Sequence, residues 1–168
     1  RDRIYLIQLS TRDTTAIIDP LAVPELAALG RLLADPSVET LFHDADYDLR
    51  ILHRDYGFTA SHLFDPRSAA QLLNEPGIGL AALLEKYLGV TLDKKYQRAD
   101  WSTRPLKAEM LAYAAMDTRH LLQVRDLLQA ETFRHFDARI GIRRAHHPLE
   151  LEIRLRNLAA LGLRFFLV

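Results

Sequence analysis

The feature that most constrains this fold is residues 109–129, which read EMLAYAAMDTRHLLQVRDLLQ. The stretch contains no Gly, no Pro and no run of β-branched residues, and it is rich in Ala, Leu and Met, so it predicts a long helix. Its apolar residues recur at a spacing close to 3.6 and form one stripe: Met110, Ala114, Leu121, Val124 and Leu128. The rest of the chain must therefore build a core against this helix.

Tyr113 and Asp117 lie beside that stripe. They are four positions apart, so a helix places them one above the other on a single face. Taken alone, the pair is explained by a surface Asp and a half-buried core Tyr. A second acidic cluster upstream favours the alternative that both belong to a functional site.

The composition excludes several classes of protein. The 168 residues suffice for one domain with a core, and the formal net charge is zero, which excludes a strongly basic nucleic-acid binder but not a local basic patch. There is no Cys, so there is no disulfide framework, thiolate metal site or cysteine nucleophile, and a reducing cytoplasm fits. No run approaches the ~18 apolar residues of a membrane span.

The order of the predicted elements favours an α/β fold with helices on a mixed sheet. Strands are predicted at residues 3–10, 14–19 and 38–42, with a short one at 62–65, and the first two form a hairpin. Helices are predicted at residues 25–34, 47–56, 67–74 and 80–88. The helical apolar periodicity becomes irregular near residue 132. Residues 148–168 are predicted as one helix with an Arg-bearing face.

Residues 44–48 (DADYD) place several carboxylates where a predicted strand leads into a helix. Ligands in open α/β sheets bind off the carboxyl ends of strands, and Mg²⁺ or Mn²⁺ prefers carboxylate and water oxygens. Asp48 is therefore a candidate metal ligand, although a first-turn Asp is also favoured by the helix dipole alone. Asp44 and Asp46 are interpreted as capping and solvated groups.

Two other patterns have alternative interpretations. His43 and Asp44 match the His-Asp pair of metal phosphohydrolases, but that site is built from several further helical His residues, and this sequence shows no helical His partners at a suitable spacing. Residues 94–104 interleave cations with aromatic rings, which suits phosphate contacts and base stacking in single-stranded nucleic acid. The alternative is a solvated loop with its Trp in the core. The candidate nucleic-acid-binding residues are His43, Lys94, Lys95, Arg98 and Trp101.

These motifs resemble the DEDD-type 3′→5′ exonucleases with a tyrosine in the third motif, and within them ribonuclease D-like proteins. LFHDADYDLRIL (residues 41–52) is similar to the second motif, and YAAMD (residues 113–117) is similar to the third. GVTLDKKYQRADWSTRPL (residues 89–106) resembles the stretch before the third motif, and LIQLS followed by IIDP resembles the strand pair after the first. The four matches occur in the family's order, from about residue 3 to residue 131.

The resemblance implies a fold, a site and a mechanism. The fold is ribonuclease H-like, a three-layer α/β arrangement with a mixed sheet flanked by helices. Asp48 and Asp117 would hold two divalent cations, Mg²⁺ or Mn²⁺, and Tyr113 would orient the attacking water. The implied reaction is two-metal phosphodiester hydrolysis at nucleic-acid 3′ ends, with RNA, and transfer RNA in particular, favoured over DNA.

The chain also departs from the family. The first motif, Asp-x-Glu on the first strand, precedes the segment that matches residues 3–10 and is absent from this sequence. Two carboxylates cannot hold two Mg²⁺ ions against their hydration, so the chain is expected to be inactive or nearly so, and the sheet is expected to expose a pairing edge. Pro66 stands where the family has Thr.

Two functional alternatives follow. Residues 1–131 are either the incomplete domain of an exonuclease or a degenerate, non-catalytic module that binds nucleic acid or a protein, and residues 132–168 form a tail of unknown role. An Asp-x-Glu strand encoded upstream favours the first.

Overall fold

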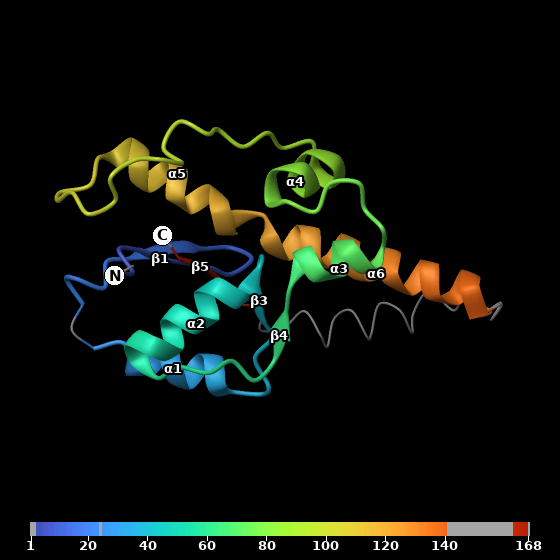
Figure 1. Cartoon of the computed structure of the whole chain (residues 1–168), viewed down its shortest axis with the longest axis horizontal. Helices are drawn as coiled ribbons and strands as arrows, with labels where there is room; N and C mark the ends of the chain where they lie inside the picture. Colours follow the sequence, from blue (N-terminus) through green and yellow to red (C-terminus); the bar gives the residue numbers. More distant parts are fainter. Residues whose placement is uncertain (1–2, 24, 141–162, 168) are drawn as a thin grey trace.

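The computed structural model describes residues 3–23, 25–140 and 163–167, and Figure 1 shows how its elements are arranged. A five-stranded mixed sheet has the order β2-β1-β5-β3-β4. β1 (Ile7–Ser10) and β2 (Thr15–Ile18) form the predicted antiparallel hairpin, while β3 (Thr40–Phe42) pairs in parallel with β4 (Leu63–Phe64). The α/β prediction is thereby confirmed.

The middle of the sheet differs from the prediction. β5 (Leu163–Leu167) lies between β1 and β3, antiparallel to the first and parallel to the second. These five residues form a strand and not the end of a helix, and the edge of β1 that was expected to be exposed is paired. The reason is that unpaired backbone groups on two strands are satisfied at once by a strand inserted between them. The rest of the predicted C-terminal helix lies outside the described residues.

Helices cover both faces of the sheet (Figure 1). α1 (Ala27–Ala34) and α2 (Ala45–Tyr56) bury Leu33 and Leu52 with Ile7 on one face. α5 (Ala108–Arg119) buries Met110 and Ala114 with Leu6 on the other. Because consecutive strand residues point to opposite faces, the neighbours Leu6 and Ile7 serve both cores, which makes three layers.

The remaining helices form a second packing unit beside the sheet. α3 (Pro66–Leu72) and α4 (Leu80–Leu88) pack against α6 (Leu121–Ile140), where Leu83, Leu84, Val124 and Leu128 are buried together. Pro66 occupies the first turn of α3, where its missing N–H is not needed. Within the described residues, no helix combines the length and the apolar character that crossing a membrane requires.

The predicted single helix over residues 109–129 is two helices, α5 and α6, which meet at His120. His120 is the C-cap of α5, and its φ of −106° and ψ of 0° depart from the ideal values of an α-helix. The break follows from packing: α5 covers the sheet, whereas Leu121 and Leu122 turn α6 toward Leu41 and Phe64. A straight helix cannot cover both surfaces. All five predicted stripe residues are nevertheless buried.

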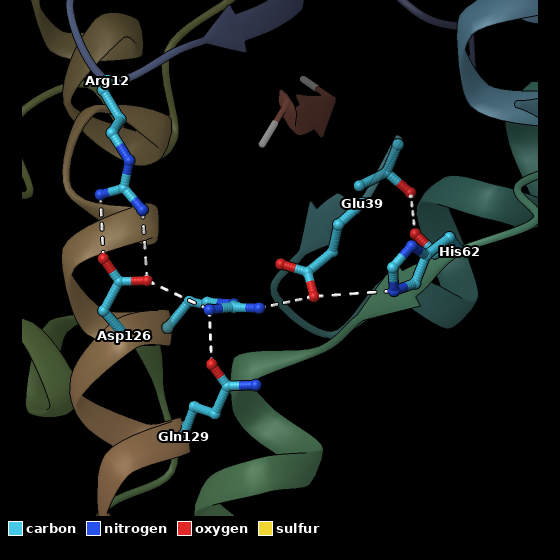
Figure 2. A network of polar contacts seen from close by, with 7 residues as sticks. Arg12, Glu39, His62, Asp126 and Gln129 are labelled. Atoms are coloured by element: carbon cyan, nitrogen blue, oxygen red, sulfur yellow. Dashed lines mark hydrogen bonds and ion pairs between the residues drawn. The ribbon is translucent and has the colours of Figure 1, made fainter. Parts of the chain in front are cut away.

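A polar network fixes α6 to the amino ends of β3 and β4 (Figure 2). Arg125 is 2% exposed, and its Nη2 donates to Glu39 Oε1 at 2.7 Å. Its Nη1 donates to Gln129 Oε1 at 2.6 Å and to Asp126 Oδ1 at 3.2 Å. The guanidinium also lies 5.5 Å from the centre of the Phe64 ring. A buried charge with this many partners holds α6 in one register on the sheet.

We predict that Arg125→Met lowers the free energy of unfolding by about 3–5 kcal/mol, because it leaves the Glu39 carboxylate buried without its main partner. The double variant Arg125→Met, Glu39→Leu recovers much of the loss, since neither charge then remains. Urea unfolding measures both. The control is Arg12→Met, which breaks the exposed ion pair with Asp126 and costs less than about 1 kcal/mol. A double variant no more stable than Arg125→Met contradicts the prediction.

Candidate active site

The carboxyl end of β3 leads directly into the candidate site. His43 follows β3 and is 7% exposed, and its Nδ1 has no hydrogen-bond partner among the described residues. Burial lowers the pKa of His43, although Asp65 and Asp44 act in the opposite direction. Asp48, in the first turn of α2, is also 7% exposed. An imidazole and a carboxylate are therefore buried within one turn of the edge where ligands of α/β sheets bind.

Asp44 joins β3 to α2 in a left-handed conformation, with φ 66°. Asp65 Oδ1 accepts the Asp44 N–H at 3.0 Å and the Arg67 N–H at 2.9 Å, so it braces this turn and caps α3. Asp44 occupies the N-cap position of α2, but its side chain makes no cap hydrogen bond and lies 3.1 Å from Arg67 Nη1. Asp46 is exposed and pairs with Arg50. The side chains of Asp44 and Asp46 are therefore both exposed.

Tyr113 and Asp117 lie together on α5. The helix is held on the sheet by the buried hydrogen bond between Thr118 Oγ1 and Ser10 Oγ, at 2.6 Å, one residue after Asp117. Burial raises the pKa of Asp117 to about 6. Burial also raises the pKa of Tyr113, with the negative charges of Asp117 and Asp93 adding to the effect. The phenol and the carboxylate are therefore electrostatic neighbours, as the helical spacing predicts.

A pocket of about 380 Å³ opens beside this pair. The described residues that line it come from α5 and from the loop before it: Thr91, Leu92, Asp93, Lys95, Tyr96, Glu109, Ala112, Tyr113, Met116 and Asp117. Asp48 is not among these lining residues. The structure thus brings Tyr113 and Asp117 to one pocket, whereas the approach of Asp48 to them stays a prediction.

The basic–aromatic loop divides into exposed cations and buried rings. Lys94, Lys95 and Arg98 are exposed, and Lys95 Nζ lies 5.1 Å from the centre of the Tyr96 ring. Trp101 is 7% exposed and packs in the core with Leu6, Met110 and Ala114, so it does not offer a free face to a stacked base. This burial favours the core interpretation of Trp101, and its contact with nucleic acid stays a prediction.

Sequence reasoning missed two residues near the site. Arg104 donates to Asp19 at 2.6 Å and to the Tyr5 carbonyl at 2.9 Å, which fixes the loop to the hairpin and lowers the pKa of Asp19. Gln8, in the middle of β1, is fully buried, and both of its amide atoms lack hydrogen-bond partners among the described residues. Gln8 could have been singled out from the sequence as a polar residue inside an apolar strand. Arg104 could not, because its partners Asp19 and Tyr5 are distant in sequence.

The residues present do not make a site for two divalent cations. Among the described residues, no group of three or more His, Cys, Asp or Glu side chains is placed to hold a metal ion. The strand next to β3, Leu163–Leu167, reads LRFFL and brings no carboxylate. Mg²⁺ bound by two carboxylates alone competes poorly with its own hydration. The donor set is therefore incomplete.

Comparison with known proteins connects this geometry to a family. A family model described as 3′-5′ exonuclease matches residues 1–132. Exosome complex component 10 of Mus musculus is 38% identical over 149 residues, which are 88% of this chain and 16% of that protein. The chain thus spans about a sixth of this relative.

Solved structures of nucleases also match this fold. The crystal structure of Escherichia coli RNase D, an exoribonuclease involved in structured RNA processing, matches with TM-score 0.75 and 35% identity, over 82% of this chain and 38% of that one. Brucella melitensis NrnC with bound Mg²⁺ matches with TM-score 0.72 and 26% identity, over 79% of this chain and 66% of that one. With the ordered motifs and the confirmed fold, these matches show that the chain belongs to the DEDD-type 3′-5′ exonuclease family.

Proposed function

We propose that this chain is part of the catalytic domain of a 3′→5′ exonuclease, which hydrolyses phosphodiester bonds from nucleic-acid 3′ ends. The observation that carries the proposal is the Tyr113–Asp117 pair, a desolvated carboxylate one helical turn from a half-buried phenol beside a pocket, in a chain of this family. Strong desolvation of a carboxylate at a pocket favours a functional role over a structural one. Asp48 is proposed as the third site residue.

The proposed roles follow from the protonation states. The raised pKa of Tyr113 keeps its hydroxyl protonated at neutral pH, so the hydroxyl can donate a hydrogen bond to a water or to a phosphate oxygen. Asp117, with a pKa of about 6, is mainly ionised at pH 7 and above and attracts positive charge. The two groups together orient a nucleophile and balance charge at one place in the pocket.

We propose that the substrate is a single-stranded RNA 3′ end, with transfer RNA among the candidates. Support comes from the similarity to RNase D, an exoribonuclease, and from the exposed Lys95, which lines the pocket, with the exposed Lys94 and Arg98 in the same loop. Such cations contact the phosphate backbone without regard to sequence. His43 is retained as a proposed contact because it follows β3 at the carboxyl edge of the sheet and its Nδ1 has no hydrogen-bond partner among the residues that the structure describes. The absence of Cys favours a cytoplasmic location.

We propose that the complete site works with two divalent cations, Mg²⁺ or Mn²⁺, for which the Mg²⁺-bound structural relative is support. Asp48 and Asp117 are the ligands that this chain offers, and further carboxylates are needed. Bound cations would activate water and stabilise the leaving oxygen. The second candidate function, a non-catalytic module that binds RNA or a protein, is favoured by the incomplete donor set. The two candidates differ in whether an extended protein cuts RNA.

We predict that this chain does not trim a labelled single-stranded RNA in MgCl₂ or MnCl₂, and that a version extended upstream by an Asp-x-Glu strand does. In the extended protein, Asp117→Asn lowers the rate at least about 1,000-fold because it removes a ligand charge, whereas Tyr113→Phe lowers it about 10- to 100-fold because it removes one hydroxyl. Gel analysis of the product ladder measures both rates.

The matched control for this experiment is Asp46→Asn, which makes the same chemical change at an exposed carboxylate that pairs with Arg50. Its rate should stay within about twofold of the parent, since surface ion pairs contribute little. Full trimming by the Asp117→Asn protein rejects the site, and an extended protein that binds RNA without cutting it supports the binding module.

We predict that Asp117→Asn stabilises this chain at high pH. The pKa of Asp117 is raised in the fold from 3.8 to about 6, so its contribution is fully present below pH 3.8 and is lost as the pH rises through 6. At pH 8 the ionised carboxylate costs about 2–3 kcal/mol, which Asn avoids. Urea unfolding at pH 8 and pH 4 should show a gain at the first and little change at the second. Equal gains at both pH values would exclude burial of charge as the cause.

A further inference from the structure

Arg104 makes five hydrogen bonds, one for each N–H of its guanidinium. Nε and Nη2 form a fork on the Asp19 carboxylate, at 2.6 and 3.0 Å. Nη2 also donates to the Tyr5 carbonyl at 2.9 Å, and Nη1 donates to the carbonyls of Trp101 and Thr103 at 2.8 and 2.9 Å. We call these contacts the Arg104 clamp. Because Tyr5 precedes β1 and Asp19 follows β2, the clamp fastens the loop between α4 and α5 to one end of the hairpin (Figure 1).

Trp101 is fixed by contacts on both sides of it in the chain. Before it, Asp100 accepts the Ser102 N–H at 2.9 Å, the Ser102 hydroxyl at 2.6 Å and the Thr103 hydroxyl at 3.2 Å, which closes the turn that contains Trp101. After it, Arg104 holds its carbonyl. The indole is 7% exposed and packs in the core under α5. The position of the Trp101 ring is therefore set by the turn and by the clamp together.

The Tyr113 ring contacts two rings of this loop. Its centre lies 6.1 Å from that of Trp101, with 33° between the planes, and 5.7 Å from that of Tyr96, in an edge-to-face arrangement with 73° between the planes. Tyr96 and Tyr113 also line the pocket side by side with Asp117. A long or aromatic side chain on a helix has two favoured values of χ1, so α5 alone leaves two positions for the Tyr113 hydroxyl. The rings of Trp101 and Tyr96 select one of them.

We propose that Arg104 is a positioning residue of the nuclease site and acts through Tyr113. The clamp holds Trp101, the rings of Trp101 and Tyr96 hold the Tyr113 ring, and this ring sets where the hydroxyl stands relative to Asp117. The inference rests on the proposed function, in which that hydroxyl orients the nucleophile. Misplacing a reacting group by about 1 Å can cost about 100-fold in rate. Loss of the clamp therefore lowers turnover and leaves the affinity for RNA in place.

The first test follows the Tyr113 ring in the full chain by ¹H–¹³C NMR, without metal or nucleic acid. The Tyr113 ring signals are those that Tyr113→Phe removes. Arg104→Lys keeps the charge but cannot bridge one carboxylate and three carbonyls, so it should shift or broaden these signals. The matched control, Arg12→Lys, makes the same change at the fork on Asp126, which joins the hairpin turn to α6, and should leave them in place.

Asp19→Asn provides a second variant. It removes the anion of the fork and keeps the guanidinium with its three carbonyl partners, so it should shift the Tyr113 signals in the same direction as Arg104→Lys and by less. This variant decides the test if the Arg104→Lys chain does not fold. Tyr113 signals that stay unchanged in the folded variants overturn the proposal.

The second test is a double-mutant cycle on RNA trimming by the protein extended upstream. Arg104→Lys should lower kcat at least about tenfold and leave KM within about threefold. In the Tyr113→Phe background the same change should lower kcat less than about twofold, because the hydroxyl that the clamp positions is already gone. An equal loss of kcat in both backgrounds, or a loss confined to KM, contradicts action through Tyr113.

The two tests separate this inference from the proposed function. Tyr113 signals that respond to Arg104→Lys, in a protein whose extended form does not cut RNA, support the clamp and reject the nuclease. Tyr113 signals that do not respond, in a protein whose extended form cuts RNA, reject the clamp and support the nuclease.

Discussion

Backbone pairing of β5 with β1 on one side and with β3 on the other is the interaction on which the rest of the structure depends. β1 with β2 and β3 with β4 are two small ladders that share no hydrogen bonds with each other, and β5 joins them into one sheet. The α1–α2 layer and α5 can both be buried only against a continuous sheet. A two-stranded ladder has little stability by itself, so the three layers form only when β5 joins the two ladders.

The polar groups of the sheet fall into two sets that lie at its opposite ends. At the amino ends of β3 and β4, the buried Arg125 donates to Glu39, Gln129 and Asp126, and of its guanidinium nitrogens only Nε is buried without a partner among the described residues. Beyond the carboxyl end of β3, His43 Nδ1 is buried without a hydrogen-bond partner in the part of the chain that the structure describes. On α5, the Asp117 carboxylate is desolvated. Satisfied buried groups hold α6 in place, whereas costly, incompletely paired ones are the groups that a substrate or a cation can use.

The sequence predicted the elements that depend on local preferences and missed those that depend on packing between distant segments. The hairpin, the strand before His43, the helix after Asp44 and the stop at Gly57 follow from local preferences, and the structure contains each of them. The split at His120 was not predictable, because residues 109–129 have uniform helix propensity and only the different surfaces under α5 and α6 separate them. The strand at residues 163–167 was missed for a similar reason: an apolar run adopts the pairing that its neighbours offer.

By itself the sequence determined the family, the order of the elements and the Tyr113–Asp117 spacing, since these depend on residue types and on the period of one helix. Only the tertiary structure decided that Trp101 is a core residue, that Arg104 joins the loop to Asp19, and that β5 occupies the middle of the sheet beside Gln8. Each of these joins segments far apart in the chain. Which segments meet is set by the free energy of burying apolar surface and pairing backbone across the whole molecule, which no local pattern contains.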